Sequence, residues 1–216
     1  MEYLILFLPL LGSFISGFFG KKIGNNYSQI ITSSLVGISA ILSIFIFYQV
    51  IVEDYSSNKI IFSWINSGNF QVNWSINVDS LSSVMLVVVS FISSLIHFYS
   101  IGYMGHDPHK PRFMAYLSLF TFAMLTLVTA DNFLQLFFGW EGVGLCSYLL
   151  IGFWYKKPTA NAAAIKAFIV NRVGDFGFAL GIFLIFFFYE TVNYNEVFQL
   201  TPSLTQKKII FLGIDF

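Results

Sequence analysis

The chain has 216 residues, of which 56% are hydrophobic and only 10% are charged. Because a soluble globular domain carries about 25% charged residues, this composition excludes an ordinary soluble domain and indicates an all-α protein that crosses a membrane several times. The 11 basic and 11 acidic side chains cancel, so net charge gives no reason to expect a nucleic-acid partner. The single cysteine excludes an intrachain disulfide and a paired-cysteine metal site, and we expect neither a metal nor a cofactor in this chain.

Six apolar stretches are long enough to cross a membrane as helices, since about twenty residues at a rise of about 1.5 Å span a bilayer core of about 30 Å. The first could be taken for a signal peptide, but Glu2 stands where positive charge should precede it, and two lysines follow in place of a cleavage site. A seventh stretch begins near Ile209 and is still apolar at Phe216, so we expect an N-terminal fragment of a longer chain. The six expected spans lie near 2–20, 28–52, 80–103, 112–130, 132–155 and 162–189.

The segment between the second and third spans departs from helical periodicity. In FQVNWSINV, residues 70–78, apolar and polar residues alternate strictly, and the preceding NSGN, residues 66–69, is typical of a turn. We therefore expect an amphipathic β-hairpin near 60–78 that lies against the outer surface of the protein. The alternative is an interfacial loop in which Trp64 and Trp74 act as membrane anchors.

Basic residues concentrate in the loops at one end of the expected helices. If the N-terminus is outside, the inner loops hold six Lys or Arg residues and the outer loops three, which obeys the positive-inside bias. The inner residues are Lys21, Lys22, Lys110, Arg112, Lys156 and Lys157, and the outer ones are Lys59, Lys207 and Lys208.

Four ionisable residues lie deep inside the expected spans. Insertion of such a residue costs about 2.5–3.5 kcal/mol, so it usually faces the interior of a helix bundle and marks an ion or proton path. Glu141 lies in the fifth span, and the sixth contains Lys166, Arg172 and Asp175. Arg172 and Asp175 are three positions apart, hence neighbours on one helix face that can neutralise each other.

The remaining two charges form the expected pair. Lys166 is nine positions from Asp175 and so lies on the opposite face of its helix, which leaves Glu141 on the adjacent span as its expected partner. Small residues around Glu141 thin the fifth helix and allow close helix approach or entry of water. They are Gly139, Gly142, Gly144 and Ser147. Such an arrangement can relay protons; the alternative is a static buried ion pair that only fixes the helix register.

Histidines give weaker signals. His97, near the inner end of the third span, is a candidate member of the relay, and a hydrogen-bonded structural histidine explains it equally well. The run HDPHKP, residues 106–111, contains metal-ligand residue types without the helical spacing of a metal site, so we expect no metal there.

Four long motifs carry a resemblance to a known family. They are YSIGYM (99–104), DPHKPRFMAYLSLFTFAMLTLV (107–128), ADNFLQLFFGWEGVGLCSYLLIGFW (130–154) and AAAIKAFIVNRVGDFGFALG (162–181). Together with NVDSLSSVM (77–85), which is similar to the start of the family's third helix, they make the chain resemble the large antiporter-like membrane subunit of respiratory complex I. This subunit is called NADH-quinone oxidoreductase chain 5 in mitochondria and subunit L in bacteria.

The resemblance implies a proton-translocating subunit that couples electron transfer from NADH to quinone to proton export. By the residue match, Glu141 corresponds to the family's key glutamate and Asp175 to the acid of its sixth helix. The family pairs this glutamate with a lysine on a seventh helix, for which Lys166 is the nearest substitute here. The resemblance also implies a boundary between an N-terminal three-helix region with the hairpin, residues 1–103, and the start of an antiporter-like domain, residues 104–216.

In such a complex the redox centres and the NADH and quinone sites belong to other subunits. The expected partners are therefore the other membrane-arm subunits, the lipid bilayer and protons. The expected location is an energy-conserving membrane, either the bacterial plasma membrane or the mitochondrial inner membrane.

Two other interpretations stay open. The large subunit of the multisubunit sodium/proton antiporters shares this fold and the buried glutamate, although GWEGVGLCSYLLIGFW (139–154) looks closer to the complex I chain. The other is a non-conducting scaffold in which Glu141 and Asp175 only hold helices together.

Overall fold

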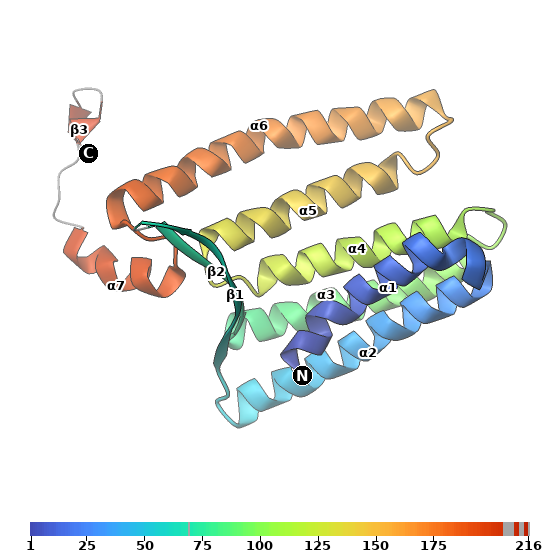
Figure 1. Cartoon of the computed structure of the whole chain (residues 1–216), viewed down its shortest axis with the longest axis horizontal. Coiled ribbons are helices and arrows are strands. Elements are labelled where there is room, and N and C mark those ends of the chain that lie inside the picture. The colour runs from blue at the N-terminus through green and yellow to red at the C-terminus, as the bar shows by residue number, and fades with distance from the viewer. Residues whose placement is uncertain (69, 205–209, 212–213, 216) are drawn as a thin grey trace.

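The computed structural model describes residues 1–68, 70–204, 210–211 and 214–215. Six long helices run alternately up and down, side by side (Figure 1). All six are long and apolar enough to cross a membrane, so the prediction of a helical multi-pass membrane protein is confirmed. The helices are α1 (Glu2–Ile23), α2 (Asn25–Val52), α3 (Ser80–Tyr103), α4 (Lys110–Val128), α5 (Phe133–Ile151) and α6 (Pro158–Tyr189).

Local sequence explains where several helices begin and end. α3 starts at a capping box, in which the Asp79 carboxylate accepts from the Ser82 N–H at 2.7 Å and the Asp79 N–H donates to the Ser82 hydroxyl. At the start of α5 the Asn132 side chain accepts from the Gln135 N–H at 2.8 Å. α1 and α2 are separated by Gly24, whose φ of 92° is a conformation that glycine adopts without steric cost.

The predicted hairpin forms between α2 and α3. β1 (Ser57–Ser67) pairs antiparallel with β2 (Phe70–Val78). Gly68 has a positive φ of 58° in the turn, and Asn69 lies outside the described residues. β2 coincides with the alternating segment 70–78, so the prediction of a hairpin near 60–78 is confirmed and the alternative of an interfacial loop is excluded.

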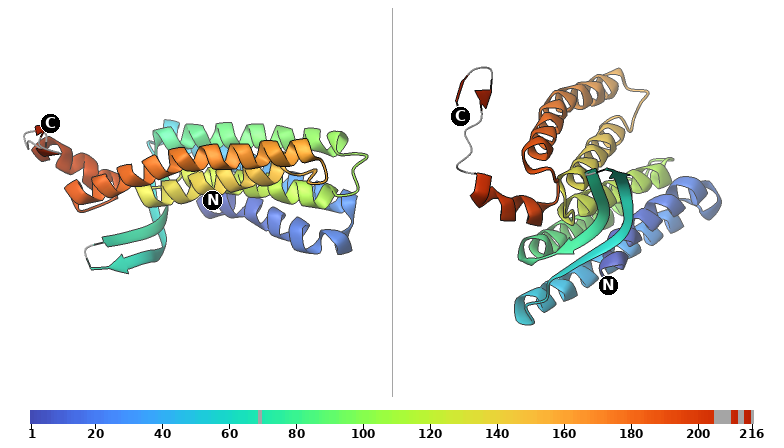
Figure 2. Two further views of the ribbon diagram at one scale, coloured as in Figure 1. Left: turned by 90° about the horizontal axis from the view of Figure 1, so that it is seen from above. Right: turned by 60° about the vertical axis from the view of Figure 1, so that its left-hand side comes forward.

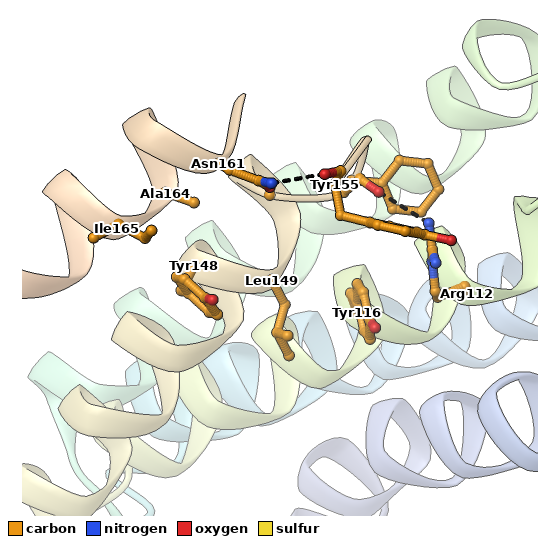
Figure 3. Close-up of a pocket in the computed structure, with 10 residues that line it drawn as sticks. Arg112, Tyr116, Tyr148, Leu149, Tyr155, Asn161, Ala164 and Ile165 are labelled. Carbon is orange, nitrogen blue, oxygen red and sulfur yellow. Dashed lines mark hydrogen bonds between the residues drawn. The ribbon is translucent and has the colours of Figure 1, made fainter. Parts of the chain in front are cut away.

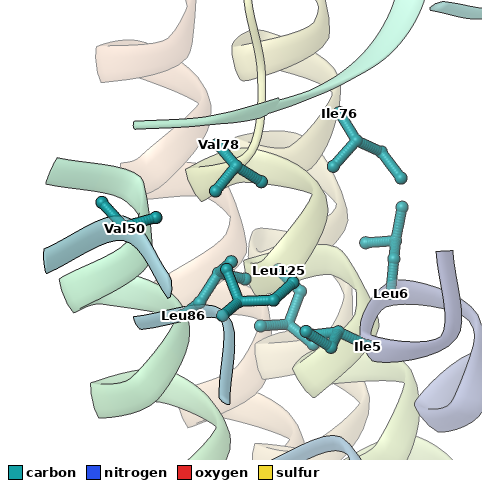
Figure 4. Close-up of a cluster of buried hydrophobic side chains, with 8 residues drawn as sticks. Ile5, Leu6, Val50, Ile76, Val78, Leu86 and Leu125 are labelled. Carbon is teal, nitrogen blue, oxygen red and sulfur yellow. The ribbon is translucent and has the colours of Figure 1, made fainter. Parts of the chain in front are cut away.

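The hairpin lies across one end of the helical bundle, which we call the hairpin end (Figure 2). Ile76 and Val78 of β2 are buried there against residues of α1 to α4 (Figure 4). A second cluster joins Val72 of β2 to Ile182 of α6 and to Val192. The apolar face of β2 therefore covers the ends of helices from both sides of the bundle. The first cluster also contains Ile5, Leu6, Ile46, Val50, Leu86 and Leu125.

Polar contacts fix the hairpin on the helices. The Gln135 amide oxygen of α5 accepts from the Ser75 N–H at 3.0 Å, and its Nε2 donates to the Ser75 carbonyl at 2.7 Å. At the start of α1, the Glu2 carboxylate lies 2.7 Å from Lys59 Nζ of β1. The hydrogen bond to that carboxylate raises the pKa of Lys59 above its ordinary value.

A further helix, α7 (Tyr194–Leu204), forms where the sequence predicted only a loop. It is short and polar and is not one of the helices that are long and apolar enough to cross a membrane. Its Tyr194 ring packs edge-on against the Phe133 ring, with 4.7 Å between the centroids. The expected start of a seventh span, near Ile209, lies outside the described residues. Beyond that point the structure describes two short antiparallel strands, β3 (Ile210–Phe211) and β4 (Ile214–Asp215).

Candidate functional site

Glu141, the acid that first marked this site, lies near the middle of α5. It follows the first residue of the helix by eight positions, about 12 Å at 1.5 Å per residue. α6 runs alongside in the opposite direction (Figure 1), so residues near its own middle reach the same depth. The Glu141 side chain is 20% exposed, which makes its charge expensive unless a partner compensates it.

Arg172 of α6 is that partner. Its Nη1 forms an ion pair with Glu141 Oε2, and the same nitrogen lies 3.8 Å from Asp175 Oδ2 on its own helix. The predicted contact between Arg172 and Asp175 is confirmed, whereas the predicted pairing of Glu141 with Lys166 is wrong. The spacing of Arg172 and Asp175 within α6 indicated only the contact between these two, but a guanidinium carries five N–H donors and can contact two carboxylates.

Lys166 lies away from this cluster. It precedes Arg172 by six positions, about 9 Å along the helix axis, and its side chain is exposed. Among the residues that the structure describes, Lys166 forms no ion pair and no hydrogen bond. α6 as a whole is little covered by this chain, because only 6% of its most apolar 18-residue stretch is buried.

The second carboxylate, Asp175, has a partner that the sequence analysis missed. The Trp140 indole N–H of α5 donates to Asp175 Oδ1 at 2.8 Å, and the Asp175 side chain is only 10% exposed. An indole N–H within a membrane span requires an acceptor. Because Trp140 lies within the fifth span, its need for an acceptor could have predicted a contact with an acid of the neighbouring span.

The cluster combines two titratable acids with one fixed charge. An arginine side chain stays protonated at any physiological pH, so protons can enter and leave only at Glu141 and Asp175. When both acids are ionised, the single guanidinium leaves one negative charge uncompensated. The Arg172 guanidinium also lies 4.5 Å from the centroid of the Phe168 ring, a cation–π contact that positions it between the two acids.

The glycines of α5 serve two different purposes. A Cβ added to Gly139 would lie 2.7 Å from the backbone of Leu127 on α4, and one added to Gly142 would lie 3.0 Å from the Ala123 methyl group. These two glycines permit the close helix approach that was predicted. A Cβ added to Gly144 would meet no atom within 4 Å, because this glycine borders open space.

That open space is a groove of about 740 Å³ between α5 and α6. Trp140, Gly144 and Ser147 line it from α5, and Asn171 and Asp175 line it from α6. Its walls are mostly apolar, with these few polar groups beside the buried acid. Its size allows water to reach Asp175, since a single water occupies about 30 Å³ in the liquid.

His97 is fully buried at a different helix interface, between α3 and α4. Its Nδ1 lies 2.8 Å from the Ser93 carbonyl, and its Nε2 lies 3.0 Å from the Ser118 hydroxyl. The Ser93 hydroxyl in turn contacts that of Thr121. Within the described part of the chain, His97 has these hydroxyl and carbonyl partners and no contact with the acids of α5 and α6.

Comparisons with known proteins bear on this arrangement. Residues 64–114 match a family model described as NADH-Ubiquinone oxidoreductase (complex I), chain 5 N-terminus, and residues 130–215 match one described as NADH:quinone oxidoreductase/Mrp antiporter, TM. The second match contains every charged residue of the cluster.

Individual relatives extend the similarity to nearly the whole chain. NADH-ubiquinone oxidoreductase chain 5 of Chondrus crispus is 53% identical over 99% of this chain, and NADH-quinone oxidoreductase subunit L of Rickettsia bellii is 50% identical over 98%. The chain spans 32% and 33% of the lengths of these two relatives.

A solved structure shares the fold. One chain of the Mrp complex from Dietzia sp. DQ12-45-1b superposes with a TM-score of 0.79 at 21% identity, covering 95% of this chain and 21% of that one. The two family models and the relatives that match nearly all of its residues show the family. The chain belongs to the antiporter-like membrane subunits of respiratory complex I, the chain 5 or subunit L family.

Proposed function

We propose that this chain is part of a proton-translocating membrane-arm subunit of an NADH:quinone oxidoreductase, in which electron transfer from NADH to quinone drives proton export. The observation that carries the proposal is the cluster of Glu141, Arg172 and Asp175 inside two membrane helices. Charges in such a setting are costly and are retained where an ion or a proton must pass. The names of the relatives, chain 5 and subunit L, support the same assignment.

In this mechanism Glu141 accepts and releases the proton. A contacting guanidinium stabilises an ionised carboxylate, whereas a carboxyl group left without a partner in a medium of low dielectric favours its neutral form. A movement that shifts Arg172 from Glu141 toward Asp175 would therefore load a proton on Glu141, and the reverse movement would release it. Asp175 takes part as the competing partner of the same guanidinium, and the groove beside it supplies water.

We also propose that Lys166 and His97 carry protons outside the cluster. Lys166 is exposed on α6, on a surface that a further helix can cover. His97 contacts a series of hydroxyl groups, which includes that of Ser118. The part of each in the relay rests on its ionisable side chain within a membrane span.

The proposal assigns the redox chemistry to other chains. NADH, quinone and the redox cofactors bind there, and this chain contacts the other membrane-arm subunits, lipid and protons. The sparsely covered surface of α6 supports contact with further protein or lipid. The division at residue 103 into an N-terminal region and an antiporter-like domain, and the location in a bacterial plasma membrane or mitochondrial inner membrane, belong to the same proposal.

The large subunit of a sodium/proton antiporter is the second candidate. The fold shared with a chain of the Mrp complex favours it, since a cluster of this kind serves any proton-coupled transporter. Sequence identity favours the first candidate, at 53% with a chain 5 protein against 21% with the Mrp chain.

One experiment separates the two functions. Inverted membrane vesicles are prepared from cells that lack the gene for the full-length protein and from cells in which the gene has been restored. We expect NADH-driven proton uptake only in the restored vesicles, and no sodium exchange driven by an imposed pH gradient. Sodium exchange that depends on the gene and proceeds without NADH would contradict the first function and establish the second.

A further inference from the structure

A second cavity lies at the end of the bundle opposite the hairpin, which we call the basic end. This pocket, of about 390 Å³, opens between α4, α5 and the start of α6 (Figure 3). Its polar lining consists of Arg112, Asn161 and three tyrosines, and its apolar lining includes Leu149 and Ile165. The tyrosines are Tyr116, Tyr148 and Tyr155.

The hydrogen-bonding groups of this pocket are incompletely used. Arg112 Nη2 donates to the Phe153 carbonyl at 2.9 Å, but the buried Arg112 Nε has no acceptor. Within the described ranges no carboxylate forms an ion pair with Arg112. The hydroxyl groups of the three lining tyrosines likewise make no hydrogen bond to any described residue. A buried donor without a partner is costly, so this arrangement is suited to an acceptor from outside the chain.

Two aromatic rings and a loop contact hold the Arg112 guanidinium in position for such an acceptor. The Phe153 and Tyr155 rings lie 4.6 Å and 5.2 Å from Arg112 Cζ, measured to their centroids. Asn161 Nδ2 of α6 donates to the Tyr155 carbonyl at 2.7 Å and so ties this loop to the first turn of the helix. The N–H donors of a planar guanidinium fixed in this way match the geometry of phosphate oxygens.

Charge and depth identify the anion. The helix ends and loops around the pocket carry Lys110, Lys156 and Lys157, while the nearby Asp107 carboxylate is already engaged by the Trp154 indole at 3.0 Å. Basic pockets between membrane helices attract the headgroups of anionic lipids. Trp154 and Tyr155 stand where α5 leaves its apolar stretch, as aromatic residues do at headgroup level.

We propose that this pocket binds the headgroup phosphate of an anionic phospholipid. The phosphate accepts from Arg112 and from the tyrosine hydroxyls, and an acyl chain follows the apolar wall at Leu149 and Ile165. Free phosphate would satisfy the same donors, but it would leave that apolar wall uncovered. This site is separate from the Glu141 cluster and does not depend on the function proposed for it.

The test uses the intact assembly that contains the full-length chain, stripped of lipid in detergent and then incubated with phosphatidylglycerol. Retention of phosphatidylglycerol per complex is measured by mass spectrometry for the unchanged protein, for Arg112→Gln and for Tyr148→Phe. Lys22→Gln is the matched control, because it removes the same charge at the same end of the bundle from an exposed residue that does not line the pocket. Tyr148→Phe removes a hydroxyl that has no protein partner, so it leaves the fold intact if Arg112→Gln does not.

We expect Arg112→Gln to weaken phosphatidylglycerol binding about tenfold and Tyr148→Phe about threefold, because charge-assisted hydrogen bonds are stronger than neutral ones. Lys22→Gln should stay within about twofold of the unchanged protein, as expected for a screened surface charge. Phosphatidylcholine should bind more weakly than phosphatidylglycerol. Equal losses in all three variants, or equal binding of the two lipids, would overturn the proposal. Displacement of the lipid by millimolar inorganic phosphate would show that the site holds free phosphate instead.

Discussion

Gly139 gives the sharpest test of how α5 is positioned. Its added Cβ would lie 2.7 Å from the Leu127 N, Cα and Cβ atoms of α4, whereas carbon atoms pack at about 3.5–4.0 Å. Gly139→Ala therefore forces the two helices apart by about 1 Å. Overpacking of this kind costs about 1–3 kcal/mol, and a backbone neighbour cannot rotate away.

Gly144→Ala is the matched control on the same helix, because its added Cβ meets no atom within 4 Å. Both substitutions gain the same helix propensity, about 1 kcal/mol, so the difference between them isolates the contact with Leu127. We expect the free energy of unfolding to be about 1–3 kcal/mol lower for Gly139→Ala than for Gly144→Ala. The full-length Gly139→Ala protein in detergent should therefore have a lower midpoint temperature of unfolding than Gly144→Ala. Equal midpoints, or a higher one for Gly139→Ala, would refute the packing described between α4 and α5.

Three further substitutions test other contacts. Gln135→Ala leaves the buried Ser75 N–H and carbonyl without partners and should lower the free energy of unfolding by about 2–4 kcal/mol. An unfolding midpoint equal to that of the unaltered protein would contradict this. Trp140→Phe keeps an aromatic ring but removes the donor to Asp175, so NADH-driven proton pumping should fall about threefold while the complex still assembles. Normal pumping would show that this hydrogen bond has no part in proton transfer. Asp79→Ala removes the cap of α3 and should lower the free energy of unfolding by about 1 kcal/mol, with an unchanged value speaking against the capping box.

The long-range pattern of the sequence was sufficient to predict the bundle. Runs of about twenty apolar residues fix six helices, because a bilayer leaves the backbone few other ways to satisfy its hydrogen bonds. Strict alternation of apolar and polar residues in β2 was likewise a local pattern that predicted the hairpin. α7 was missed because an eleven-residue polar helix has neither the length nor the hydropathy of a span, and its formation depends on contacts such as that of Tyr194 with Phe133.

The candidate site was predicted less completely. Depth and burial cost pointed to Glu141 and Asp175 from their residue types alone. The partner of Glu141 depended on the rotation of α5 against α6, which residue spacing within one helix does not determine. The same holds for Trp140 and for the pocket around Arg112, because each joins residues of helices whose mutual register is set by packing at positions such as Gly139.

Whether Glu141 carries protons can be tested by measuring the number of protons exported per NADH oxidised. Vesicles would contain the assembled complex with full-length subunit carrying Glu141→Gln, with assembly checked on a native gel. Glu53→Gln, which neutralises an exposed acid at the end of α2, is the control. If Glu141 carries protons, this ratio should fall sharply in Glu141→Gln and stay unchanged in Glu53→Gln. A normal ratio in assembled Glu141→Gln would mean that the acid only holds Arg172 and the helices in place.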